Sequence, residues 1–149
     1  MATTIYFSGS ISSGRQDVET YRRIVAAMEA EGHRVHAGAV TAEHIGASGE
    51  AIAPHEIFAR DVAWIDESDL VVAEVSVPSN GVGYEIAYAR HARNIPVICL
   101  WRAGFTTRCS AMIAGDRGIE LIAYDGFGAM LPRLLESIRR AWRYPDRLP

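Results

Sequence analysis

The amino-acid sequence predicts an α/β fold in which helices cover both faces of a five-stranded parallel sheet. Five short apolar runs alternate with segments of helical periodicity. The apolar runs read TIYFSGS, HRVHAG, DLVVAEV, IPVICLW and GIELIAY. Strands that alternate with helices are joined by right-handed crossovers, and this connection makes neighbouring strands parallel.

Four helices are expected between and after these strands. The first spans residues 13–32, and its apolar side chains recur at the spacing of one helical face: Tyr21, Ile24, Val25 and Met28. The second runs from Pro54 to about Glu67, with the proline near its first turn. Residues 81–94 and 128–142 form the third and fourth. The polar, poorly periodic stretch between the second strand and Pro54 is expected to be a loop with a helical turn.

Five strands in this arrangement suit a flavodoxin-like, doubly wound sheet of order 2-1-3-4-5. In such sheets ligands bind beyond the carboxyl ends of the strands, at the switch point between strands 1 and 3. The loop FSGSISSGR follows strand 1, and the loop SVPSNGVGYE follows strand 3. The topology therefore brings both loops to one edge of the sheet.

Size and charge restrict the classes of partner. A chain of 149 residues that is 49% apolar and 22% charged has the size and composition of one globular domain, residues 1–149. The formal net charge of −3 argues against broad binding of nucleic acid polymers or anionic membranes. No apolar stretch approaches the roughly 20 residues of a membrane span, and no signal peptide is recognisable. We expect a cytoplasmic protein.

Several kinds of chemistry lack their motifs. The histidines and the two cysteines follow no metal-ligand spacing, so neither a metal nor a cofactor is expected. There is no GxSxG elbow and no Ser/His/Asp arrangement, which argues against acyl-transfer hydrolysis.

The first loop has the residues of an anion site. Gly9 permits close approach of the backbone, Ser10 offers a hydroxyl group, and Arg15 adds a positive charge at the start of the first helix. A phosphate monoester needs such a set of donors. The alternative is a polar strand-to-helix loop with an ordinary cap.

The second loop adds donors and a carboxylate. Ser79 and the amides near Gly81 can bind the same phosphate or a sugar hydroxyl, and Glu85 is expected in the first turn of the helix that follows. The helix dipole there favours the ionised form of a carboxylate. An ionised glutamate that faces an anomeric carbon is a competent nucleophile or a stabiliser of an oxocarbenium ion. The alternative is a solvated glutamate with no chemical role.

Two further side chains are candidates from their positions. Asp61 falls inside the apolar stripe of the second helix, so we expect it to point toward a core, where burial raises the pKa of a carboxylic acid and suits it to act as a general acid. The alternative is a buried aspartate that pairs with an arginine. Tyr6, in strand 1, is placed to orient Glu85, or else is a core tyrosine. Glu74, near the end of strand 3, is expected to bond loop amides and to be structural.

Three stretches together resemble a known family, the 2′-deoxynucleoside 5′-phosphate N-hydrolases of the nucleoside 2-deoxyribosyltransferase superfamily. They read IYFSGSISSGRQD, FARDVAWIDESDLVVAEVSVPSNGVGYEIAYA and TRCSAMIAG. The resemblance implies the flavodoxin-like fold and hydrolysis of the N-glycosidic bond of deoxynucleoside monophosphates, which yields a free base and 2-deoxyribose 5-phosphate.

The resemblance also implies roles for individual residues. Glu85 would act on the anomeric carbon, Asp61 would assist protonation of the leaving base, and Tyr6 would position Glu85. The phosphate and sugar site would be lined by Gly9, Ser10, Ile11, Arg15, Ser79 and Gly81. Ser110 would reach the phosphate in the neighbouring active site of a homodimer, and Met112, from the same stretch, is placed among the substrate-binding residues.

Other functions stay open at this point. In a nucleoside deoxyribosyltransferase a second base, and not water, would accept the sugar. Some relatives act on ribonucleotides such as cytidine monophosphate. A sensor would bind deoxynucleotides without turnover. A receiver-like signalling domain would need an acidic cluster after strand 1 and an aspartate at the end of strand 3, where this chain has FSGSIS and the segment from Ser76 to Ser79.

Overall fold

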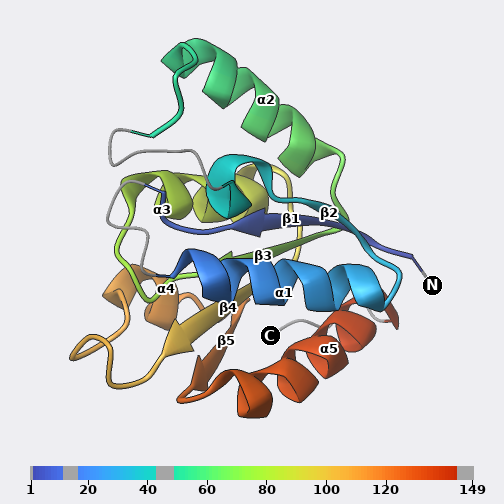
Figure 1. Cartoon of the computed structure of the whole chain (residues 1–149), viewed down its shortest axis with the longest axis vertical. Helices are drawn as coiled ribbons and strands as arrows, with labels where there is room; N and C mark the ends of the chain where they lie inside the picture. Colours follow the sequence, from blue (N-terminus) through green and yellow to red (C-terminus); the bar gives the residue numbers. More distant parts are fainter. Residues whose placement is uncertain (1, 12–16, 43–48, 144–149) are drawn as a thin grey trace.

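The computed structural model describes residues 2–11, 17–42 and 49–143, without the side chains of the last two of these residues. Its sheet has five parallel strands in the order β2-β1-β3-β4-β5, which confirms the predicted topology (Figure 1). The strands are β1 (Thr4–Ser8), β2 (Arg34–His36), β3 (Leu70–Glu74), β4 (Val97–Arg102) and β5 (Ile119–Tyr124).

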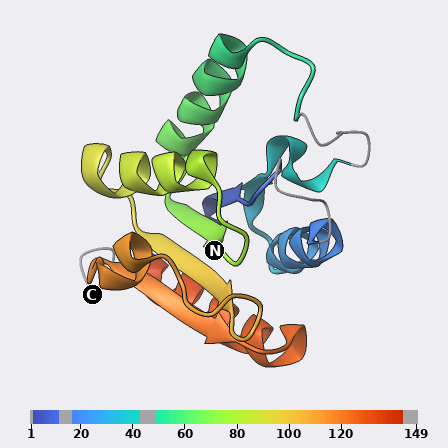
Figure 2. The same ribbon diagram turned by 90° about the vertical axis from the view of Figure 1, so that its left-hand side faces the viewer.

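Helices cover both faces of the sheet, as expected (Figures 1 and 2). The described helices are α1 (Val18–Ala30), α2 (Pro54–Asp66), α3 (Asn80–Ala87), α4 (Ala111–Gly115) and α5 (Phe127–Arg143), with a 3-10 turn, η1 (Gly38–Thr41), and a π-helical turn, η2 (Tyr88–Ala92). The predicted start of the first helix falls partly in residues 12–16, which lie outside the described part of the chain. The five-residue α4 was not expected, since so short an element has no periodicity to detect.

Alternation along the strands divides the core into two layers. Ile5 and Phe7 of β1 face α1 and α5, where they pack with Ile24 and Leu134. Tyr6, between them in sequence, faces the opposite layer, formed by α2, α3 and α4. Odd-numbered side chains of β1 therefore belong to the layer of α1 and α5, and even-numbered ones belong to the opposite layer.

The first turn after β1 lies directly on the α1 layer. A Cβ atom added at Gly9 would lie 3.0 Å from Val40 Cγ1 and 3.1 Å from two ring atoms of Tyr21. These contacts are tighter than side chains normally make, so a larger residue at this position would require the side chains of Val40 and Tyr21 to shift.

Helix α2 corrects one expectation. Only the C-terminal end of its apolar stripe reaches the core, where Ile65 is buried and Trp64 packs, because the rest of the helix leans away from the sheet (Figure 1). Phe58 is 54% exposed and makes an edge contact with the exposed ring of Tyr84 on α3. Asp61 therefore points not into a hydrophobic core but toward the space between α2 and the sheet.

Candidate active site

A cavity of about 340 Å³ opens at the carboxyl edge of the sheet, where β1 and β3 are neighbours. Its walls come from the turns after these strands, from α2 and from the segment around η1. It is lined by seven of the residues singled out from the sequence: Tyr6, Gly9, Ile11, Asp61, Ser79, Gly81 and Glu85. Segments that are far apart in the chain thus meet at the switch point of the sheet.

Three of the other four candidates do not line this cavity. Arg15 is outside the described residues. The hydroxyl group of Ser10 is buried, has no hydrogen-bond partner within the described ranges, and does not line the cavity. Ser110 and Met112 line a different cavity. The roles assigned to these four residues, and to the seven that line the cavity, stay predictions.

Glu85 is the carboxylate with the most specific surroundings. Ser8 Oγ donates a very short hydrogen bond to Glu85 Oε2, and the Tyr6 hydroxyl group also hydrogen-bonds this carboxylate. Tyr6 and Ser8 are two residues apart on β1, so their side chains share one face of the sheet. The end of a single strand therefore holds the glutamate with two hydroxyl groups.

The expected protonation of Glu85 was wrong. Helix α3 begins at Asn80, so Glu85 lies in its second turn, where the helix dipole has little effect. Desolvation by burial raises the pKa of Glu85 to about 7, against the lowering effect of the Ser8 hydrogen bond, and the negative charge of Asp61 adds to the rise. At neutral pH the side chain is therefore present in both its protonated and its ionised forms.

Asp61 is paired with a cation. Arg60 donates to Asp61 Oδ1 from Nε at 2.9 Å, and its two terminal nitrogens bind Glu50 at 2.6 and 2.7 Å. Burial raises the pKa of Asp61, and the hydrogen bond from Arg60 opposes this rise. The prediction that Asp61 has a raised pKa is confirmed, and the alternative of an arginine partner also holds.

Tyr6 stays protonated over any ordinary pH range. Burial raises its pKa first of all, and the negative charges of Glu85 and Asp61 raise it further. A tyrosine in this state donates its hydrogen and cannot itself act as a base near neutral pH. Its arrangement is suited to orienting Glu85.

Sequence reasoning missed the contacts made by Ser8, Arg60 and Glu50. The signal for Ser8 was available, because it follows Tyr6 at the two-residue period of a strand. No comparable signal marked the Glu50–Arg60 pair, since ten residues and an irregular segment separate them. Among the described residues no cluster of His, Cys, Asp or Glu could hold a metal ion, and no described helix has the length and hydropathy of a membrane span.

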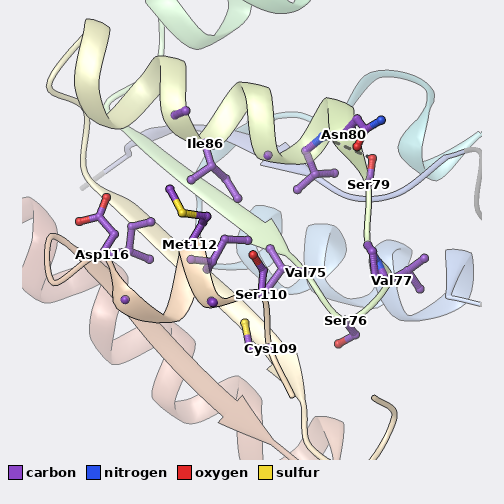
Figure 3. Close-up of a pocket in the computed structure, with 18 of the residues that line it drawn as sticks. Val75, Ser76, Val77, Ser79, Asn80, Ile86, Cys109, Ser110, Met112 and Asp116 are labelled. Atoms are coloured by element: carbon purple, nitrogen blue, oxygen red, sulfur yellow. Dashed lines mark hydrogen bonds between the residues drawn. The ribbon is translucent and has the colours of Figure 1, made fainter. Parts of the chain in front are cut away.

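A second, larger cavity of about 930 Å³ is a groove between α3 and α4. Figure 3 shows Ile86 of α3 and Met112 of α4 on facing sides of it, with Ser110 at the start of α4. The two cavities share Ser79 and Val82, at the N-terminal end of α3. Met112 is 84% exposed, so an apolar side chain next to Ser110 lies free on the described surface.

Comparisons with known proteins show the family to which the chain belongs. The sequence model of the nucleoside 2-deoxyribosyltransferase family matches residues 5–120. A Syntrophotalea carbinolica protein provisionally named 2′-deoxynucleoside 5′-phosphate N-hydrolase 1 is 42% identical over 137 residues, 90% of this chain and 93% of the relative. The 5-hydroxymethyl-dUMP N-hydrolase of Mus musculus is 41% identical, over 87% of this chain and 83% of its own.

Solved structures share the fold. The Clostridium botulinum CMP N-glycosidase superposes with a TM-score of 0.64 at 19% identity, over 90% of this chain and 98% of its own. At that identity the likeness is one of architecture alone.

Replacing Ser8 with alanine removes a donor that favours the ionised form of Glu85. We expect the pKa of Glu85 in Ser8→Ala to rise above about 7, as measured by NMR titration of its side-chain carboxyl carbon. Ser137→Ala is a matched control, because it removes a buried serine hydroxyl that donates to another carboxylate, Glu120. An unchanged pKa of Glu85 in Ser8→Ala would contradict the assigned contact.

Titration of Glu85 also links stability to pH. Because the folded-state pKa is raised from 4.5 to about 7, the stability contributed by the protonated side chain is present below about pH 4.5 and is lost as the pH rises through about 7. The shift corresponds to about 3 kcal/mol. The free energy of unfolding of Glu85→Gln, relative to wild type, should therefore rise by up to about 3 kcal/mol over this window and then level off. Urea denaturation at several pH values measures it, and a flat difference would show that Glu85 does not titrate in this way.

Proposed function

Because the chain belongs to the nucleoside 2-deoxyribosyltransferase family, we propose that it hydrolyses the N-glycosidic bond of (2′-deoxy)ribonucleoside 5′-monophosphates. The products are a free nucleobase and (2-deoxy)ribose 5-phosphate. The observation that carries the proposal is a partly buried glutamate with a pKa of about 7, hydrogen-bonded to Ser8 and Tyr6 at the switch point of the sheet. The names of relatives that are about 40% identical support the reaction class.

Chemistry takes place at the anomeric carbon. The bond from C1′ to the base nitrogen breaks, its electron pair leaves with the base, and the base takes up a proton from Asp61. Ionised Glu85 either forms a bond to C1′ or stabilises its positive charge. Water then attacks C1′ and gives a proton to the Asp61 carboxylate, and any bond between Glu85 and C1′ breaks with its electron pair returning to Glu85. These steps regenerate the enzyme and release the sugar phosphate.

The phosphate is bound by backbone and hydroxyl donors of the two turns. Ser79 caps α3, where its hydroxyl accepts from Val82 N at 3.4 Å, and the first amides of this helix are directed at the sheet edge. Gly9 and Ile11 line the same cavity from the other turn. Arg15 and Ser10 complete the expected donor set.

A homodimer provides the rest of the site. In their own chain Ser110 and Met112 line the groove beside α3 and not the cavity that holds Glu85. Across a two-fold axis, α4 of one chain can lie beside the active site of its partner. Exposed apolar side chains on α2, α3 and α4 support an interface here: Phe58, Tyr84 and Met112. We place this dimer in the cytoplasm.

The test of the function is release of base from a panel of deoxy- and ribonucleoside monophosphates. We expect Glu85→Gln to lower kcat on the order of 10⁴-fold, while the control Glu29→Gln, on the exposed side of α1, keeps full activity. For wild type, kcat/KM should rise as the pH increases through about 7, because the ionised form of Glu85 reacts.

Three outcomes would overturn this assignment. Full turnover by Glu85→Gln would remove the glutamate from the mechanism. Exchange of a free base into a deoxynucleoside, with no net hydrolysis of monophosphates, would identify a transferase, and binding of monophosphates without turnover by wild type would identify a sensor.

Shared sites predict complementation between inactive chains. Glu85→Gln and Ser110→Ala each impair both sites of their own homodimer. In a mixed dimer one site combines wild-type Glu85 with wild-type Ser110, so we expect mixing of the two variants to restore up to about a quarter of the wild-type activity, as measured by base release after co-refolding. Activity no greater than the sum of the separate variants would argue that Ser110 acts in its own chain or not at all.

A further inference from the structure

A buried polar cluster lies on the other face of the sheet, behind the two turns that form the cavity. It contains the carboxylates of Glu74 and Asp17, and its remaining members are Ser76, Arg102, Tyr21 and Tyr124. We propose that Glu74 is a positioning residue that fixes the two phosphate-binding turns, the one after β1 and the one after β3, relative to each other. This inference rests on the proposed function, since it assigns to Glu74 a part in nucleotide binding.

Glu74 holds the turn after β3. Its side chain is only 1% exposed and accepts from both the hydroxyl group and the backbone N–H of Ser76, the latter at 3.3 Å. Tyr124, at the end of β5, donates to Glu74 Oε1 at 3.0 Å. The same Ser76 hydroxyl accepts from Arg102 N of β4 at 2.7 Å. The ends of three adjacent strands are therefore tied to the turn that leads to Ser79.

The turn after β1 is tied to the same cluster at both of its described ends. The Tyr21 hydroxyl group is hydrogen-bonded to the backbone of Ser10, and it lies close enough to Glu74 to interact with its charge. At the far end, Arg102 binds the buried carboxylate of Asp17 at 2.7 Å, just before α1 begins. Arg102 contacts both turns. Its backbone N–H donates to Ser76 in the turn after β3, and its guanidinium group binds Asp17 at the end of the turn after β1.

The chemistry of the cluster argues against simple packing. A buried carboxylate costs several kcal/mol unless it is hydrogen-bonded, and apolar residues would fill the space with less penalty. Burial raises the pKa of Glu74, whereas the donors from Ser76 and Tyr124 oppose this rise. The Ser76 hydroxyl group, the Ser76 backbone N–H and the Tyr124 hydroxyl group all donate to the oxygens of Glu74, which is the arrangement that an ionised acceptor requires. The carboxylate of Glu74 therefore fixes the positions of the donors on Ser76 and Tyr124.

The relative position of the two turns matters because donors on both turns must bind the same phosphate group. Donors on each turn contact the same phosphate only if their separation matches the anion, and a misplacement of about 1 Å can cost about 10²-fold. Glu85 is held separately, by Ser8 and Tyr6 on the opposite face of the sheet. Loss of Glu74 should therefore affect binding of the phosphate and leave the chemical step intact.

The test separates nucleotide from nucleoside. In Glu74→Gln one acceptor oxygen becomes an NH₂ donor that cannot accept from its neighbours. We expect KM for a deoxynucleoside monophosphate to rise about tenfold and kcat to stay within about twofold, whereas kcat/KM for the matching deoxynucleoside, which lacks the phosphate, stays unchanged. The pH dependence that arises from Glu85 should not move.

Tyr124→Phe provides a second, milder variant if Glu74→Gln does not fold. It removes one donor and should raise KM about threefold with the same selectivity for the phosphate. Ser137→Ala breaks a buried serine–carboxylate contact between α5 and β5. This control should leave KM unchanged for both the nucleotide and the nucleoside. Calorimetry with 2-deoxyribose 5-phosphate measures the same loss of affinity without turnover.

The outcomes distinguish this inference from the function on which it rests. Absence of turnover by wild type would defeat the proposed function, and weaker calorimetric binding by the Glu74 and Tyr124 variants would still support the positioning role. The positioning role would be overturned by an equal loss of kcat/KM for nucleotide and nucleoside. A fall in kcat at unchanged KM, or a shifted pH profile, would also overturn it.

Discussion

The charge of Glu85 is the constraint on which the site depends. In the proposed mechanism the carboxylate that attacks or stabilises C1′ must be ionised, yet it must lie in a sheltered cavity from which water is largely excluded. Burial opposes ionisation, and the hydroxyl groups of Ser8 and Tyr6 partly restore it. The balance leaves the pKa of Glu85 close to 7, where a modest change in either contribution alters the reactive fraction.

The parallel sheet makes this balance possible. At the switch point the turns after β1 and β3 leave in opposite directions around the sheet, which opens a space that α2 covers from one side. Strand alternation then sends the ends of β1 and β3 to different layers. Ser8 donates a hydrogen bond to Glu85 on one face, while Ser76 donates one to Glu74 on the other, so the two carboxylates are held by separate sets of contacts.

Helix α2 illustrates how a local pattern can mislead. Its apolar spacing is that of a helix packed on a core, but Phe58 lies in solvent and only Ile65 is fully buried. The stripe instead faces the cavity and an exposed ring on α3. Hydrophobic periodicity reports which side of a helix is apolar, and it does not report whether that side meets the protein's own core, a ligand or another chain.

The sequence by itself, through local patterns and a resemblance to a known family, predicted the strand order, the two turns at one edge and residues around the cavity, among them Tyr6, Asp61 and Glu85. Local patterns could do so because strand and helix periods are encoded within a few residues and the crossover rule adds the rest. Only the tertiary structure decided the protonation of Glu85, its contact with Ser8 and the pairing of Asp61 with Arg60. The Ser8–Glu85 contact joins side chains 77 residues apart, and both desolvation and hydrogen bonding depend on distances of that kind, which no stretch of sequence contains.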